Sequence, residues 1–118
     1  SDVGLRTYLL GKSLGKDLGH ILENIIFLEL KRKGYKIYIG KDSDNEIDFV
    51  CETEDELIYI QVALTVRDEN TLKRELKPLE MLQDNYKKYI ITLDYDTNNY
   101  NGIKQISAID FLLNRVDL

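Results

Sequence analysis

The sequence predicts an α/β domain with helices flanking a mixed central sheet, and three observations support this prediction. Apolar residues recur at helical spacing after Asp17, and Gly34 supplies a stop. Two later segments, residues 46–53 and 57–64, alternate apolar and polar side chains as strands do. A charged helical segment then separates this pair from another apolar strand at residues 88–93. The chain therefore combines a hairpin with a helix-connected strand.

Length and composition fit one folded domain spanning residues 1–118. Charged residues are 31% and hydrophobic residues 43% of the 118, which is typical of folded proteins. The net charge of −5 argues against a free-standing DNA-binding protein, because Lys and Arg supply most non-specific affinity for phosphates. No apolar run approaches the roughly 18 residues that span a membrane, so no membrane partner is expected. The single cysteine, Cys51, suits a reducing cytoplasm, which is the expected location.

The N-terminal third is expected to hold two helices and a strand. A short helix at residues 3–10 leads through a connection rich in Gly and Lys, residues 11–16, into a helix at residues 17–33 capped by Asp17. Residues 35–40 form the first strand. The apolar stripe of the main helix consists of Leu18, Ile21, Leu22, Ile25 and Ile26.

The two alternating strands are expected to form an antiparallel hairpin. If Glu54 and Asp55 make a two-residue tip, the residue numbers of each cross-strand pair add up to 109. Asp48 then lies directly across from Gln61. Cross-strand neighbours have Cβ atoms about 5 Å apart, so both side chains could reach one ion. A longer loop would shift this register. One face is predicted to hold Ile47, Phe49, Cys51, Ile58, Ile60, Val62 and Leu64, and the other Asp48, Val50, Tyr59, Gln61 and Ala63.

The C-terminal half begins with a charged helix that starts at Asp68 or Asn70. Pro78 is expected to kink or split this helix, since proline removes a backbone hydrogen bond. A strand at residues 88–93, a polar loop at 94–102, a strand at 103–107 and a helix at 108–115 follow.

Three polar residues form the candidate site. Asp48 and Gln61 are the predicted metal ligands, because hard divalent cations such as Mg²⁺ prefer carboxylate and amide oxygens. Glu23, at the margin of the helix stripe, is positioned to hold a metal-bound water or a second ion. Residues 41–60 carry one Lys against eight Asp and Glu. This composition fits either a solvent-exposed hairpin or a group of carboxylates whose mutual repulsion is relieved by a bound cation. The alternative to a site is a polar cluster at a sheet edge.

Two other motifs are incomplete. The segment Gly11-Lys12-Ser13 lacks the earlier glycine and the preceding strand of a phosphate-binding loop, so no nucleotide site is expected within the chain. The loop at residues 94–102 alternates acidic and polar side chains as a calcium loop does, but lacks the required glycine and terminal glutamate.

The chain resembles two groups of proteins. The segments Gly19-x-x-x-Glu23, Glu46-Ile-Asp-Phe-Val50 and Tyr59-Ile-Gln-Val62 are similar to the restriction-endonuclease-like PD-(D/E)xK superfamily. The whole chain resembles a C-terminal domain of unknown function attached to bacterial and archaeal AAA-type ATPases. The residues carrying this second resemblance are Asp2-Val-Gly-Leu-Arg6, Leu22-Glu23-Asn24, Thr71-x-x-Arg74-Glu75, Asp84-Asn-Tyr-x-Lys88 and Gly102-Ile103.

This resemblance implies a restriction-endonuclease-like αβββαβ core, with Asp48 and Gln61 as metal ligands and Glu23 as the helix acid. The chain departs from the superfamily pattern at two positions, with Gln61 in place of Glu and Ala63 in place of the catalytic Lys. Lys73 or Arg74 is then the candidate substitute for the missing lysine. The resemblance also implies an ATPase domain of the same polypeptide as a partner, with this chain as its excised C-terminal domain.

We therefore expect an accessory, catalytically degenerate domain that binds DNA or a protein partner. One alternative is a Mg²⁺-dependent DNA endonuclease with a relocated basic residue. Another is a protein–protein interaction module whose acidic hairpin docks onto a basic partner.

Overall fold

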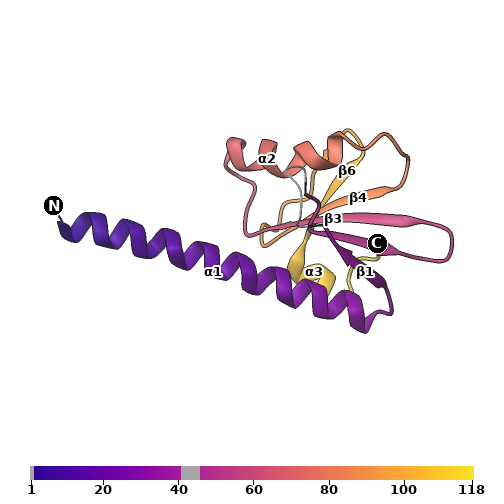
Figure 1. Ribbon diagram of the computed structural model, residues 1–118, viewed down its shortest axis with the longest axis horizontal. Helices are drawn as coiled ribbons and strands as arrows, with labels where there is room; N and C mark the ends of the chain where they lie inside the picture. The colour runs from indigo at the N-terminus through magenta and orange to yellow at the C-terminus, as the bar shows by residue number, and fades with distance from the viewer. Residues whose placement is uncertain (1, 41–45) are drawn as a thin grey trace.

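The computed structural model describes residues 2–40 and 46–118 and shows a mixed α/β fold (Figure 1). Six strands form one sheet in the order β1-β2-β3-β4-β6-β5, flanked by helices on both faces. The elements are α1 (Asp2–Arg32), β1 (Lys36–Ile39), β2 (Phe49–Glu52), β3 (Leu57–Ala63), α2 (Glu69–Glu80), β4 (Lys87–Thr92), β5 (Asn99–Tyr100), β6 (Ile103–Ser107) and α3 (Ala108–Leu112).

Helix α1 is continuous, so the predicted break at residues 11–16 is wrong. Its 31 residues run from Asp2 to Arg32, and the N-terminal part projects beyond the body of the domain (Figure 1). Gly11 and Gly15 lower helix stability by about 1 kcal/mol each, but glycine keeps its backbone N–H and need not end a helix. Gly34, with φ of +92°, follows the helix end as predicted, in a conformation that favours glycine.

The hairpin prediction is confirmed. Strands β2 and β3 are antiparallel with Phe49 opposite Ile60, a register that sums to 109. The Thr53 N–H donates to the Glu56 carbonyl at 2.9 Å and closes the two-residue tip. Beyond this hairpin, β3, β4 and β6 are parallel, whereas β1 and β5 pair antiparallel at the two edges. The sheet is therefore mixed, as the sequence predicted.

Two apolar cores lie on opposite faces of the sheet. Helices α1 and α3 cover one face and α2 covers the other (Figure 1). The core under α1 contains Leu22, Ile26, Leu30, Phe49, Cys51, Ile58, Ile60, Val62, Tyr89, Ile91, Ile106, Ala108 and Phe111. The core under α2 contains Ile47, Tyr59, Val66, Leu76, Leu79, Ile90 and Ile103.

The placement of Ile47 corrects one prediction. The alternation pattern put Ile47 beside Phe49 under α1, but it packs in the core under α2. The reason is that β2 begins only at Phe49, so strand alternation does not reach Ile47. The backbone there passes close to Gly40, since a Cβ added to Gly40 would lie 2.5 Å from the Ile47 carbonyl oxygen.

Helix α2 begins where the sequence predicts, directly after Asp68. Asp68 caps it by accepting a hydrogen bond from the Thr71 N–H at 3.0 Å. The helix runs through Pro78 without splitting and ends two residues later at Glu80. Proline has no backbone N–H to donate to the carbonyl four residues earlier, so the helix loses one hydrogen bond at Pro78 but continues to Glu80.

The C-terminal segment differs from prediction at two points. The expected polar loop contains the short strand β5, which pairs with β6. Helix α3 ends at Leu112 rather than Arg115, because Asn114 adopts a left-handed conformation with φ of 58°. Among the described residues, no helix is both long and apolar enough to cross a membrane.

Replacing Gly40 with alanine should lower the free energy of unfolding by about 1–3 kcal/mol, because the new methyl group would overlap the Ile47 backbone. Urea denaturation followed by circular dichroism measures this loss. Gly19→Ala is the matched control: it lies in a helix with open space around it and should be neutral or stabilise by about 1 kcal/mol. Equal effects of the two substitutions would contradict the close approach.

Candidate functional site

Asp48 and Gln61 lie together, as the hairpin register predicts. The Asp48 backbone N–H donates to Gln61 Oε1 at 2.7 Å, and the Val62 N–H donates to Asp48 Oδ2 at 2.9 Å. These side-chain bonds continue the pairing of β2 and β3 one residue beyond the regular ladder, which ends at Phe49. Gln61 is buried at 4% exposure, so its amide is part of the framework that holds Asp48.

Helix α2 adds Glu75, which the sequence prediction missed. Gln61 Nε2 donates to the Glu75 carbonyl oxygen at 3.3 Å and ties the strand to the helix. The pKa of the Glu75 carboxyl is raised to about 7, mainly by burial and then by the negative charge of Asp48. Arg74 opposes this shift, and Glu23 adds to it. The charges of Asp48, just before β2, and of Glu23, on α1, therefore both act on the Glu75 carboxyl of α2.

The position of Glu75 in the sequence carried a signal. It falls between Leu72 and Leu76 and precedes Leu79, at the i, i+3, i+4 and i+7 spacing of an apolar helix face. A carboxyl group on such a face is costly to bury as an ion and commonly shifts its pKa. This signal identifies an unusual acid, whereas its neighbours Asp48 and Glu23 become apparent only in the fold.

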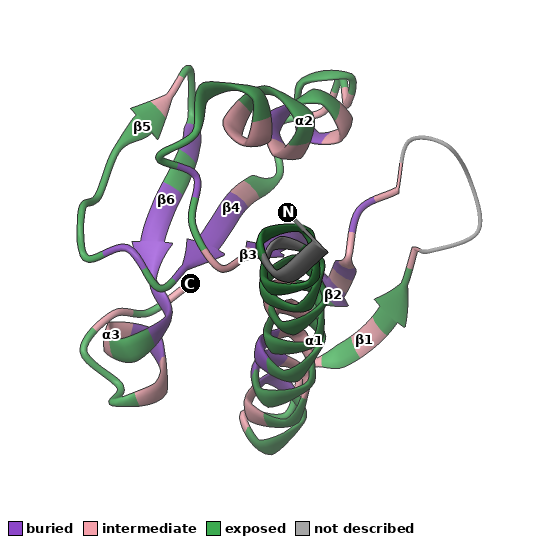
Figure 2. Ribbon diagram, turned by 90° about the vertical axis from the view of Figure 1, so that its left-hand side faces the viewer, coloured by how far each residue is buried: buried purple, intermediate pink, exposed green. Residues whose placement is uncertain are grey.

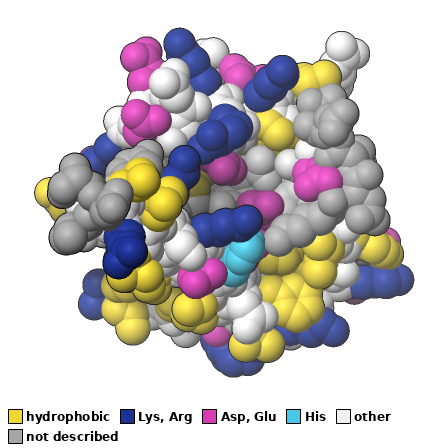
Figure 3. All heavy atoms as spheres, turned by 60° about the vertical axis from the view of Figure 1, so that its left-hand side comes forward, with side chains coloured by type: hydrophobic (Ala, Val, Ile, Leu, Met, Phe, Trp, Pro, Cys, Tyr) yellow, Lys and Arg dark blue, Asp and Glu magenta, His cyan; other side chains and the backbone are white. Residues whose placement is uncertain are grey.

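Glu23 also borders a hollow between α1 and the β1–β2 edge of the sheet. The hollow has a volume of about 280 Å³ and is lined by His20, Glu23, Asn24, Phe27, Ile39 and Phe49. Figure 3 shows acidic side chains set into this side of the molecule with Lys and Arg side chains around them. His20 is exposed and stands at the rim of the hollow.

The two candidate basic residues differ in their surroundings. Lys73 is 73% exposed and lies 4.0 Å from Glu69 in a solvent-facing ion pair along α2. Arg74 is also exposed, but its charge acts on the Glu75 carboxyl and on Asp68. Ala63, where a lysine was expected from the superfamily pattern, packs at the edge of the core under α2. Of these two residues, Arg74 is therefore the one whose charge acts on Glu75.

The donor set at the site suits a hydrated Mg²⁺ rather than a fully protein-ligated ion. Asp48 and Glu75 offer carboxylate oxygens, and Mg²⁺ commonly binds through one or two carboxylates and keeps several waters. Within residues 2–40 and 46–118, no three His, Cys, Asp or Glu side chains are grouped so as to hold a metal ion. Gln61 Oε1 already accepts a hydrogen bond from Asp48, so it could contribute only its second lone pair.

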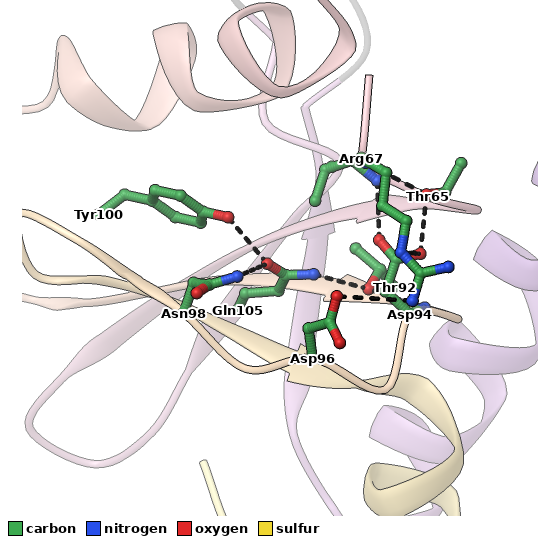
Figure 4. Close-up of polar contacts among 9 residues, drawn as sticks. Thr65, Arg67, Thr92, Asp94, Asp96, Asn98, Tyr100 and Gln105 are labelled. Carbon is green, nitrogen blue, oxygen red and sulfur yellow. Dashed lines mark hydrogen bonds and ion pairs between the residues drawn. The ribbon is translucent and has the colours of Figure 1, made fainter. Parts of the chain in front are cut away.

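A second polar network lies at the ends of β3 and β4 (Figure 4). Buried Asp94 accepts hydrogen bonds from the Thr65 hydroxyl at 2.7 Å and from the Val66 N–H at 2.9 Å. Arg67 approaches Asp94 at 3.6 Å and Asp96 at 3.5 Å. These contacts hold the turn after β3 against the turn after β4. The alternating acidic residues Asp94 and Asp96 therefore have a structural role.

Gln105 on β6 extends this network. Its Oε1 accepts hydrogen bonds from Asn98 Nδ2 at 3.2 Å and from the Tyr100 hydroxyl at 2.9 Å, and its Nε2 donates to the Thr92 hydroxyl at 3.2 Å (Figure 4). Every buried side-chain polar atom among the described residues has a hydrogen-bond partner. The network is therefore self-contained and supports the sheet.

Comparison with known proteins gives a family and two relatives. A family model with the description "Domain of unknown function (DUF4143)" matches residues 18–113. An uncharacterized protein of Haemophilus influenzae is 42% identical over 113 residues, which cover 95% of this chain and 27% of that protein. An uncharacterized protein of Methanocaldococcus jannaschii is 32% identical over 102 residues, which cover 83% of this chain and 23% of that protein.

The chain thus spans about a quarter of the length of these relatives. No solved structure matches it.

Proposed function

Because the chain belongs to the DUF4143 family, whose matched relatives are about four times as long, we propose that it is an accessory domain of a larger protein. In this proposal the larger protein contains an AAA-type ATPase domain, and this chain is its C-terminal part. The domain has a restriction-endonuclease-like core that binds nucleic acid or a protein partner without cleaving DNA.

The order of elements supports the nuclease-like core. From α1 through β4 the chain runs helix, three antiparallel strands, helix, strand, which is the αβββαβ order of that proposal. Asp48 and Gln61 lie opposite each other across the hairpin, and the charge of Glu23 acts on the same site from α1. Fold alone does not establish an activity, and the function is determined by the residues of the site.

The observation that carries the non-catalytic proposal is the structural use of Gln61 together with Ala63. Both ends of the Gln61 amide make hydrogen bonds within the protein, to Asp48 and to the Glu75 backbone. Alanine at position 63 supplies no positive charge to stabilise an attacking hydroxide or the phosphorane that it forms. Loss of one such electrostatic group commonly lowers a rate by about 10²–10³.

Asp48 and Glu75 would hold a hydrated Mg²⁺, which supplies positive charge that can polarise a bound phosphate. Burial raises the pKa of Glu75 to about 7, and the negative charges of the Asp48 and Glu23 carboxylates add to this shift. In this proposal a cation, or the positive charge of a binding partner, relieves their repulsion.

A Mg²⁺-dependent endonuclease is the second candidate. The observation favouring it is that Glu75 brings a third carboxylate to Asp48 and Glu23 and that the charge of Arg74 acts on Glu75. In that case Arg74 would take the role of the missing lysine.

The test pairs Mg²⁺ titration calorimetry with cleavage of supercoiled plasmid. The domain should bind Mg²⁺ weakly, with a Kd of roughly 1 mM, and show no cleavage above background. Asp48→Asn should abolish binding while keeping an oxygen that can accept the Val62 hydrogen bond. Asp55→Asn, at the exposed hairpin tip, is the matched control and should bind as the wild type does. Cleavage lost in both Asp48→Asn and Arg74→Ala would favour the endonuclease.

Fluorescence anisotropy with labelled DNA separates nucleic-acid binding from protein binding. If the partner is DNA, affinity should fall steeply as the salt concentration rises, because counterions are released on binding. Absence of any DNA binding at about 50 mM salt would leave the protein-partner form of the proposal.

A further inference from the structure

Helix α1 carries a second apolar face that does not belong to the domain core. Leu22, Ile26 and Leu30 are buried against the sheet. On another side of the helix, Leu18, Ile21, Ile25 and Leu28 remain 45%, 54%, 41% and 57% exposed. Figure 2 shows α1 as exposed along its outer faces, with burial confined to the side that meets the sheet.

The exposed residues have the spacing of a helix-pairing seam. Leu14, also exposed, precedes them, and the five positions 14, 18, 21, 25 and 28 follow one another in steps of four, three, four and three. This is the heptad spacing through which two helices pack in a coiled coil. At about 100° per residue the five side chains lie within a strip about 80° wide, and no charged residue between positions 10 and 28 falls inside that strip.

The charges that flank this seam make it complementary to itself in one orientation. Asp17, Asn24 and Lys31 follow one another at seven-residue intervals along one edge of the seam. In an antiparallel pair the two copies of this edge face each other, so Asp17 of one copy meets Lys31 of the other, twice. Asn24 then meets Asn24 at the two-fold axis.

The same register also aligns the apolar residues. When Asp17 faces Lys31, Leu18 packs against Leu28 of the second copy, and Ile21 packs against Ile25, again twice. A shift by one heptad towards the N-terminus would keep as many apolar layers, with Leu14 against Ile25 and Leu18 against Ile21, but would place Asp17 opposite Asn24 in place of Lys31. The Asp17–Lys31 pairs therefore select one of the two antiparallel registers.

We propose that a second copy of this chain docks antiparallel along the part of the seam formed by Leu18, Ile21, Ile25 and Leu28, with Asp17–Lys31 ion pairs on both ends. The domain is then a two-fold symmetric dimer, and the two candidate sites lie on separate copies. This inference does not depend on the proposed function. In the single chain, the Lys31 ammonium lies 5.9 Å from the centre of the Phe27 ring.

Sedimentation equilibrium of the 118-residue chain between about 1 and 200 μM tests the proposal. We expect a monomer–dimer equilibrium, with a dimer Kd raised about 100-fold or more by Ile21→Asp, since a buried unpaired charge would replace a central apolar contact. Leu9→Asp is the matched control, because Leu9 is 54% exposed but lies on another side of α1. It should leave the Kd unchanged, and circular dichroism should show both variants folded.

Charge exchange tests the register. Asp17→Lys alone and Lys31→Asp alone should each weaken the dimer about tenfold, because each creates two like-charge pairs. The double variant Asp17→Lys/Lys31→Asp should recover the original Kd to within about threefold. A chain that is monomeric throughout the range would overturn the proposal, as would a dimer disrupted by Leu9→Asp but not by Ile21→Asp. Failure of the double variant to recover would overturn the antiparallel register.

Discussion

Replacing Phe49 with alanine should lower the free energy of unfolding by about 3–5 kcal/mol, a large part of the roughly 5–15 kcal/mol that stabilises a domain. Phe49 is 3% exposed and lies at the start of β2, in the core under α1. Its ring centre is 6.0 Å from that of Phe27. Truncation would remove this ring contact and leave a cavity between the helix and the sheet. Urea denaturation followed by circular dichroism measures the loss.

Two further substitutions make this measurement specific. Phe49→Leu keeps most of the buried apolar volume and should cost less than the alanine variant. Ile39→Ala removes an apolar side chain that is 55% exposed on the edge strand β1, so it should cost under about 1 kcal/mol. If Phe49→Ala were no more destabilising than Ile39→Ala, Phe49 would not be a core residue, and the assignment of sheet faces would be wrong.

The hairpin could be predicted from the sequence because two local signals agreed. The alternation in residues 46–53 matched that in residues 57–64, and a two-residue tip at Glu54 and Asp55 keeps both in step. With that tip, the alternation predicted the register and hence the contact between Asp48 and Gln61. Short-range pattern therefore sufficed for the part of the candidate site that lies within one hairpin.

Features that depend on distant contacts were harder to predict. The glycines near the start of the chain suggested a break, yet α1 continues through them, because a residue preference of about 1 kcal/mol does not decide a helix boundary. Ile47 follows the alternation in sequence but lies before the first residue of β2. Its packing under α2 depends on a backbone path that period-two alternation does not describe.

At the candidate site, the surroundings of Glu75 were likewise hard to predict, because they depend on contacts between residues far apart in the sequence. Its place on the apolar face of α2 was visible in the sequence, but its proximity to Asp48 and Glu23 requires the helix to pack over β3. Individually the three residues are ordinary acids. In the fold, Glu75 is partly buried and lies where the charges of Asp48 and Glu23 add to the rise that burial causes in its pKa.

Glu75→Gln should therefore make the domain more stable at high pH. The pKa of Glu75 is raised from 4.5 to about 7 in the folded protein, so folding favours its protonated form. The stabilisation linked to this proton is complete below about pH 4.5 and is lost as the pH rises through about 7. The shift corresponds to about 3 kcal/mol, which we reduce to about 2 kcal/mol for solvent screening of a partly exposed group.

Unfolding free energies of wild type and Glu75→Gln, measured by urea denaturation from pH 4 to 9, should thus diverge as the pH rises. Taking the difference between the two proteins removes contributions of the other acids, including Asp68 and Asp84, whose pKa values are lowered and which act in the opposite sense. Glu69→Gln, on the exposed first turn of α2, is the matched control and should show little divergence. A constant difference between wild type and Glu75→Gln across this range would mean that Glu75 is ionised without penalty. The carboxylates would then not be coupled, and the electrostatic basis for a cation or a basic partner at this site would be lost.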